Sequence, residues 1–96
     1  MKYLRIMTVC GFGLGTSLVL KMTLDEVLAE DGIQAVTFCS DADTALGQTY
    51  DLVVTSHDLE GMFADVTQPV VVVDNFLSAE EVREKVIPAV RDLITR

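Results

Sequence analysis

The stretch LRIMTVCGFGLGTS, residues 4–17, decides how the chain folds. Leu4 to Val9 form a short apolar run that ends in a glycine-rich turn, which is typical of a buried strand. From about Thr16 to Asp31 the apolar residues take helical spacing. A strand, a tight turn and a helix in this order predict the start of an alternating α/β chain.

The rest of the chain continues this alternation. Further strands are predicted at Gln34–Cys39, 52–54 and Val70–Val73, and helices at Asp41–Leu46 and from Ser78 onward. The four consecutive β-branched residues at 70–73 indicate a strand that is buried on both faces. Residues 57–69 fit a loop with one helical turn at 60–64.

The last helix has a clear beginning and an internal proline. Ser78 and Glu81 form a capping box, in which each side chain satisfies a backbone N–H of the other residue. Pro88 removes one helical hydrogen bond, so we expect a kink or a division into two pieces.

Continuous apolar strands that alternate with helices predict a parallel sheet with helices on both faces. Right-handed crossovers give four strands the order 2-1-3-4, which is a small flavodoxin-like fold. In such sheets a ligand binds beyond the carboxyl ends of the strands, where the strand order reverses. The segments delivered there are 10–17, 55–58 and 74–76.

Length and composition limit the classes of protein to consider. The 96 residues suffice for one domain, residues 1–96, and the 50% hydrophobic content argues against disorder. No apolar run approaches the ~20 residues of a membrane-spanning helix, and no secretory signal pattern is present. We therefore expect a cytoplasmic protein that does not insert into the membrane.

The charge balance also argues against two classes of partner, nucleic acid and anionic lipid. Seven basic and 15 acidic residues give a net charge of −8, which opposes binding to nucleic acid and to anionic lipid. Such a charge suits a partner with a basic docking face, although it also serves solubility alone.

Cys10 stands at the base of a loop that is suited to binding an oxyanion. Three alternate glycines allow close approach of the backbone, and successive N–H groups form a concavity for anions. The helix behind the loop adds its positive N-terminal end, which also favours the nucleophilic thiolate form of Cys10. The candidate phosphate-binding residues are Gly11, Phe12, Gly13, Leu14, Gly15, Thr16 and Ser17.

Other known glycine-rich motifs match this loop less well. The glycine spacing departs from the dinucleotide-binding fingerprint, and a nucleotide P-loop needs a lysine before its hydroxyl residue. A tight structural turn with a buried, inert cysteine remains an alternative.

At this loop the chain resembles the IIB subunits of the bacterial phosphoenolpyruvate-dependent sugar phosphotransferase system. Lys21-Met22, Asp25 and the segment 75–78 extend the resemblance over nearly the whole chain. It is closest to the ascorbate branch, and the galactitol and lactose/cellobiose types are more distant.

The resemblance implies a phosphotransferase. Phosphohistidine of a IIA protein would phosphorylate Cys10, and the phosphocysteine would phosphorylate a sugar held by the membrane transporter IIC. The carrier would thus meet the inner face of the membrane transiently, through IIC. It implies no cofactor, metal or nucleotide for this step.

Low-molecular-weight tyrosine phosphatases share this fold and a Cys-x5-Arg-Ser/Thr loop. Here Thr16 occupies the arginine position, so the charged clamp on the transition state is missing. A small cysteine phosphatase and a non-catalytic, anion-binding regulatory module are the alternative functions.

The remaining polar candidates carry two interpretations each. His57 and Asn75 could lie at the rim of the site near the phosphoryl group, but solvent exposure explains His57 better and turn chemistry explains Asn75 better. Cys39 is expected to be a buried small side chain near Cys10. Phe12 and Leu14 are expected to offer an apolar docking surface.

Overall fold

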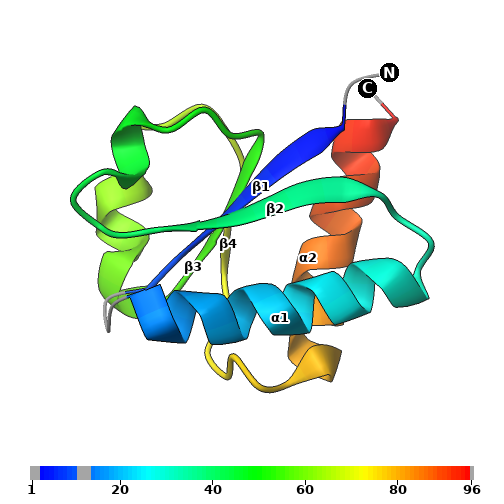
Figure 1. The fold of residues 1–96 in the computed structure, drawn as a ribbon. Helices are drawn as coiled ribbons and strands as arrows, with labels where there is room; N and C mark the ends of the chain where they lie inside the picture. Colours follow the sequence, from blue (N-terminus) through cyan, green and yellow to red (C-terminus); the bar gives the residue numbers. More distant parts are fainter. Residues whose placement is uncertain (1–2, 11–13, 96) are drawn as a thin grey trace.

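The computed structural model describes residues 3–10 and 14–95, and they form an alternating α/β fold (Figure 1). The elements are β1 (Leu4–Val9), α1 (Leu14–Glu30), β2 (Ala35–Ser40), η1 (Ala45–Gly47), β3 (Leu52–Thr55), η2 (His57–Phe63), β4 (Val70–Val72) and α2 (Ala79–Ile94). The four strands are parallel in the order β2-β1-β3-β4, which confirms the predicted flavodoxin-like sheet.

The strand register aligns the carboxyl ends of the strands. Val9, the last residue of β1, pairs with Ser40 of β2 and with Thr55 of β3. Thr55 in turn pairs with Val72 of β4. The residues that follow the four strands therefore share one edge of the sheet, as predicted.

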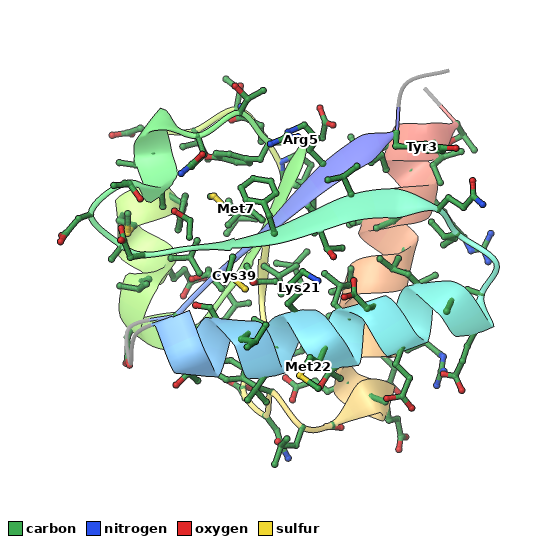
Figure 2. All side chains as sticks on the ribbon, in the orientation of Figure 1. Tyr3, Arg5, Met7, Lys21, Met22 and Cys39 are labelled. Carbon is green, nitrogen blue, oxygen red and sulfur yellow. The ribbon has the colours of Figure 1, made fainter. Side chains whose placement is uncertain are left out.

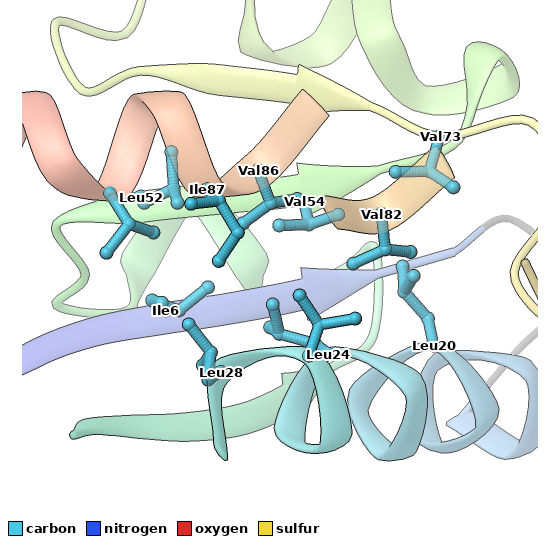
Figure 3. Close-up of a cluster of buried hydrophobic side chains, with 12 residues drawn as sticks. Ile6, Leu20, Leu24, Leu28, Leu52, Val54, Val73, Val82, Val86 and Ile87 are labelled. Carbon is cyan, nitrogen blue, oxygen red and sulfur yellow. The ribbon is translucent and has the colours of Figure 1, made fainter. Parts of the chain in front are cut away.

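Both α helices pack on one face of the sheet. They enclose a core between α1, α2, β1 and β3, drawn in Figure 3. Its buried members are Ile6, Leu20, Leu24, Val27, Leu28, Leu52, Val54, Val73, Val82, Val86, Ile87 and Val90. The α1 members are the leucine and valine stripe that helical spacing predicts.

The second face carries a smaller core under the 3-10 helices η1 and η2. Met7 and Val53 point to this face, and Ala45, Tyr50 and Phe63 cover them. The rings of Tyr50 and Phe63 meet edge to face, with centroids 6.5 Å apart. The predicted helices on both faces are thus present, but those of the second face are short 3-10 elements.

Three local predictions need correction. The 70–72 strand is half-buried, because it lies at the edge of the sheet and has only one neighbour. The helix predicted at Asp41–Leu46 is a turn followed by η1. The carboxylate of Asp41 starts this turn by accepting hydrogen bonds from the backbone N–H and the hydroxyl of Thr44.

The third correction concerns α2, which is one continuous helix through Pro88 and is not divided into two pieces. Its first turn is capped by Ser78 Oγ, which accepts from the N–H of Glu81 at 3.1 Å. The carboxylate of Glu81 does not complete the capping box. It accepts instead from the N–H groups of Asp74 and Asn75, which precede the helix.

The beginning of β1 and the end of α2 lie close together, at the end of the sheet away from the carboxyl edge (Figure 1). Tyr3 and Leu4 line the same surface cavity as Arg91, Leu93 and Ile94.

Candidate functional site

Cys10 follows β1 at the carboxyl edge, where the strand order reverses between β1 and β3. Its side chain is 2% exposed. Four residues further along the chain, Leu14 begins α1, so the thiol stands just ahead of the positive end of a 17-residue helix. Gly11, Phe12 and Gly13 lie outside the described residues, as does the side chain of Leu14.

The first turn of α1 faces a groove on the surface. Gly15 and Thr16 line it from the helix, and residues 74–77 line it from the loop that joins β4 to α2. The groove has a volume of about 610 Å³. The loop is fixed to α1 because the Thr23 hydroxyl donates to the Phe76 carbonyl at 2.7 Å.

Ser17, the last of the predicted phosphate-binding residues, is fully buried. Its carbonyl accepts a hydrogen bond from the Thr8 hydroxyl of β1 at 3.1 Å. This bond fixes the first turn of α1 against the strand that delivers Cys10. Ser17 therefore anchors the start of α1 on the side of the sheet, whereas Gly15 and Thr16 face the groove.

His57 lies next to the β4–α2 loop and is exposed to solvent. Its side chain is 63% exposed, and Nε2 lies 2.5 Å from a carboxylate oxygen of Asp74. Glu60 approaches the other ring nitrogen to 3.6 Å, and Lys85 lies 3.6 Å from the second oxygen of Asp74. His57 thus links η2 to the β4–α2 loop.

Asn75 shapes the turn between β4 and α2. Its side-chain oxygen accepts from the N–H of Leu77 at 3.0 Å, which is an Asx turn. Its own N–H donates to Glu81 at 2.9 Å. This geometry fits the turn interpretation of Asn75.

Glu81 is the most strongly perturbed carboxylate near the site. Hydrogen bonds from the Asp74 N–H and from Lys85 are the main causes that lower its pKa from the ordinary 4.5 to about 2. The ammonium of Lys85 lies 2.6 Å from the Glu81 carboxylate. This charged anchor holds the β4–α2 loop, and with it one wall of the groove.

Cys39 lies in β2 opposite Thr8, whose hydroxyl is 3.4 Å from its sulfur. Its side chain is half-buried between β2 and α1 (Figure 2). Cys10 is two residues beyond Thr8, and both thiols are free.

Sequence reasoning missed two features of this edge. One is an apolar surface, here called the α1 apolar face, that consists of Leu18, Val19, Met22 and Leu77. The first three are spaced i, i+1 and i+4 on the side of α1 opposite its core stripe, with Met22 on the solvent side (Figure 2). The signal was a helix that is apolar on both sides.

The other missed feature is a pair of buried hydroxyls, those of Thr55 and Ser56, where β3 ends. The sequence places the segment 55–58 at this edge, but nothing in it predicts that these two hydroxyls are buried.

The family comes from a comparison with family models. A model described as "PTS system, Lactose/Cellobiose specific IIB subunit" matches residues 5–87, which contain all elements of the site. The chain belongs to this IIB family. A IIB domain is a phosphoryl carrier of a sugar phosphotransferase system and works with IIA and IIC components.

A solved structure supports the fold of this IIB chain. The lactose-specific IIB component domain from Streptococcus pneumoniae matches with a TM-score of 0.61 at 14% sequence identity, over 98% of this chain and 97% of the other. A comparison with curated proteins gave no significant match. Within residues 3–10 and 14–95, no helix has both the length and the apolar character needed to cross a membrane.

Proposed function

We propose that this IIB chain carries its phosphoryl group on Cys10. The N–P bond of a IIA phosphohistidine breaks as the sulfur of Cys10 forms an S–P bond. The S–P bond then breaks as a hydroxyl oxygen of the sugar, held by IIC, attacks phosphorus and loses its proton. The observation that carries this proposal is the position of Cys10, between the reversal point of the sheet and the head of α1.

The helix head supplies the chemistry that this thiol needs. The first N–H groups of a helix have no intrahelical partner, and they point toward the segment that precedes the helix. They and the helix dipole stabilise a thiolate before transfer and a phosphoryl dianion after it. Loop residues 11–17 are the proposed phosphate cradle.

The burial of Cys10 adds a requirement. In-line attack on phosphorus needs the donor nitrogen, the phosphorus atom and the sulfur in one line. Cys10 is only 2% exposed, so a docked donor cannot reach its sulfur in this conformation. Transfer therefore includes a step in which the sulfur becomes accessible to the docked donor.

The absence of a charged clamp favours a carrier over a phosphatase. Thr16 stands in the first turn of α1 at the position where the phosphatase loop has arginine. A carrier must hand its phosphoryl group on, so strong stabilisation of the transition state for hydrolysis would waste it.

The α1 apolar face is the proposed docking surface for IIA. Leu77 is 78% exposed and Met22 is 63% exposed, and Val19 and Leu77 line the same groove. Large apolar side chains gathered at the surface often mark a site of protein contact. This face adjoins the groove at Gly15 and Thr16, so a protein seated on it is next to the helix head.

The charge of the chain defines the chemistry of the partner. Lys21 is paired with Asp25 at 2.7 Å, and Lys85 with Glu81. Arg83 and Arg91 are paired with Glu30 and Asp31. Because these cations are neutralised within the chain, the uncompensated charge is acidic, and we expect an apolar contact surface with a basic rim on the partner.

The sugar is the finer part of the proposal. The loop 10–17 and the segments around Lys21 and Asn75 resemble the ascorbate branch most closely, whereas the matching family model is of the lactose/cellobiose type. We therefore propose ascorbate or a related acidic sugar as substrate, with a β-linked disaccharide as the competing outcome. Residues 1–96 would act as one domain in the cytoplasm. This domain would reach the membrane only by binding IIC.

Intact mass spectrometry tests the carrier function. The chain is incubated with phosphoenolpyruvate, the general phosphotransfer proteins and a matching IIA. We expect the mass of one phosphoryl group to be added to the wild type and not to Cys10→Ser, while Cys39→Ser behaves as the wild type. No gain with a competent donor would favour a non-catalytic anion-binding module, and release of phosphate from an aryl ester would favour a phosphatase.

Addition of IIC vesicles and candidate sugars to the phosphorylated chain then identifies the substrate. Loss of the added mass with ascorbate, but not with lactose or cellobiose, is expected. The reverse result would assign the chain to the disaccharide branch.

A further inference from the structure

Two buried hydroxyls at the end of β3 have no hydrogen-bond partner among the residues that the structure describes. They are Thr55 Oγ1 and Ser56 Oγ. Thr55 is fully buried, and Ser56 is 6% exposed. Buried polar groups in folded proteins are almost always paired, because an unpaired one loses its bonds to water without compensation. Such an orphan next to a candidate site points to a partner that arrives with the ligand.

The sheet register places Ser56 beside Cys10. Val9 pairs with Thr55, so Cys10 and Ser56 are the next residues along two neighbouring parallel strands, which lie about 4.8 Å apart. The end of β3 is fixed on its other side, where the Val73 N–H donates to the Thr55 carbonyl at 2.9 Å. Ser56 therefore lies next to Cys10, at the point where the strand order reverses.

The two hydroxyls differ in direction. Val53 belongs to the core under η1 and η2, and alternation places Thr55 on that same face. Ser56 follows the strand and lines a cavity of about 220 Å³ whose other lining residues are His57, Asp58, Val73, Asp74 and Phe76. Asp74 and Phe76 also line the groove at the head of α1. Of the two, Ser56 is the one whose cavity shares lining residues with the groove, and the register makes it the neighbour of Cys10.

We propose that the Ser56 hydroxyl donates a hydrogen bond to an oxygen of the phosphoryl group carried on Cys10. This inference rests on the proposed function. A phosphoryl dianion has only acceptor oxygens, so each donor around it stabilises the charged form. A neutral donor suits a carrier, because it holds the group less tightly than a cation would.

Two described basic side chains near this edge already have partners. His57, the next residue, contacts Asp74, and Lys85 is paired with Glu81. Neutral hydroxyl and backbone donors are thus the groups left to hold the phosphoryl oxygens at this edge.

Ser40 provides a matched control for the test. It is 4% exposed and ends β2 on the other side of β1, but its hydroxyl contacts the Asp41 carbonyl at 3.2 Å and the Thr44 hydroxyl at 3.1 Å. Without phosphoryl donor, Ser56→Ala is expected to melt within about 1 °C of the wild type, because no bond is lost. Ser40→Ala is expected to melt at a lower temperature.

The decisive measurement is the phosphorylated fraction at equilibrium with phosphorylated IIA, read by intact mass. Ser56→Ala is expected to lower the phosphorylated-to-free ratio about tenfold, and Ser56→Thr, which keeps the hydroxyl, to restore it. Ser40→Ala leaves the ratio unchanged.

Three results would overturn the inference. A wild-type ratio in Ser56→Ala shows that the hydroxyl does not contact the phosphoryl group. A marked drop in melting temperature of unphosphorylated Ser56→Ala shows that the hydroxyl serves the fold. A wild-type chain that gains no phosphoryl group removes both this inference and the carrier function, so the two failures are distinguishable.

Discussion

At the scale of single residues, the chemistry depends on Cys10, and the sequence predicted its place but not its surroundings. The cysteine, the glycine spacing and the strand before them sufficed to place a thiol at the head of a helix. Its burial was anticipated only in the alternative of a tight structural turn, and the sequence could not decide for it, because burial depends on packing at the carboxyl edge by segments far away in the sequence.

Burial leads to a prediction for thiol chemistry. In a Cys39→Ala background, Cys10 of the folded chain is expected to react with a thiol reagent at least about tenfold more slowly than in denaturant, because only an opened form exposes the sulfur. Cys10→Ala, which leaves the half-buried Cys39, is expected to react faster. Absorbance of the released chromophore follows both. Equal rates for Cys10 in the folded and denatured chain would mean that the thiol is open to solvent.

At the scale of elements, the sequence predicted the strands and α1 well because their apolar spacing is regular. The sequence-based prediction failed where a side chain bonds to residues outside its own helix. Glu81 had the spacing of a capping box with Ser78, but its carboxylate binds the N–H groups of Asp74 and Asn75. The short second-face elements were predicted as helical turns, but their bounds and 3-10 type were not, because 3-10 turns carry little periodicity.

The Glu81 anchor predicts acid sensitivity. The pKa in the folded chain, about 2, lies below the ordinary 4.5, so the carboxylate stabilises the fold above pH 4.5 and this stabilisation is lost as the pH falls toward 2. Glu81→Gln is expected to lower the free energy of unfolding at pH 7 by about 1–2 kcal/mol. It is also expected to flatten the acid dependence over this range.

Urea unfolding at several pH values measures both effects. Glu80→Gln, at an exposed neighbouring position, serves as the control and is expected to follow the wild type. An unchanged acid profile in Glu81→Gln would mean that other groups control the loss of stability.

The α1 apolar face predicts a docking defect without a folding defect. Leu77→Ser is expected to weaken binding of IIA about five- to tenfold in calorimetric titration, because it removes the most exposed apolar side chain of the face. Leu46→Ser is the matched control, since Leu46 is 55% exposed but lies in η1 on the second face of the sheet. Equal losses in both variants would place the docking surface elsewhere.

At the scale of the whole molecule, the two faces of the sheet differ in construction. One carries both α helices, and the other carries short 3-10 elements over a small core. The sequence predicted the sheet order, which follows from alternation and handedness alone. It did not predict this asymmetry, because an irregular cover has no repeating pattern to read.

The net charge of −8 predicts how the chain meets its partner. Association with a basic-rimmed IIA is expected to slow about tenfold when ionic strength rises from low to physiological values, where the screening length is about 8 Å. Stopped-flow kinetics measures this. Leu77→Ser is expected to keep the same salt dependence, since it alters contact and not charge. An association rate that does not change with salt would show that charge plays no part in recognition of the partner.

The closeness of Tyr3 to the end of α2 has a practical result. A few added residues could join the two ends, which would permit a circularly permuted chain with new ends in the loop that follows η1. A IIA module could equally be tethered at either end without covering the thiol. In such a fusion the donor would be present at a high effective concentration, and phosphoryl exchange could be studied as an intramolecular reaction.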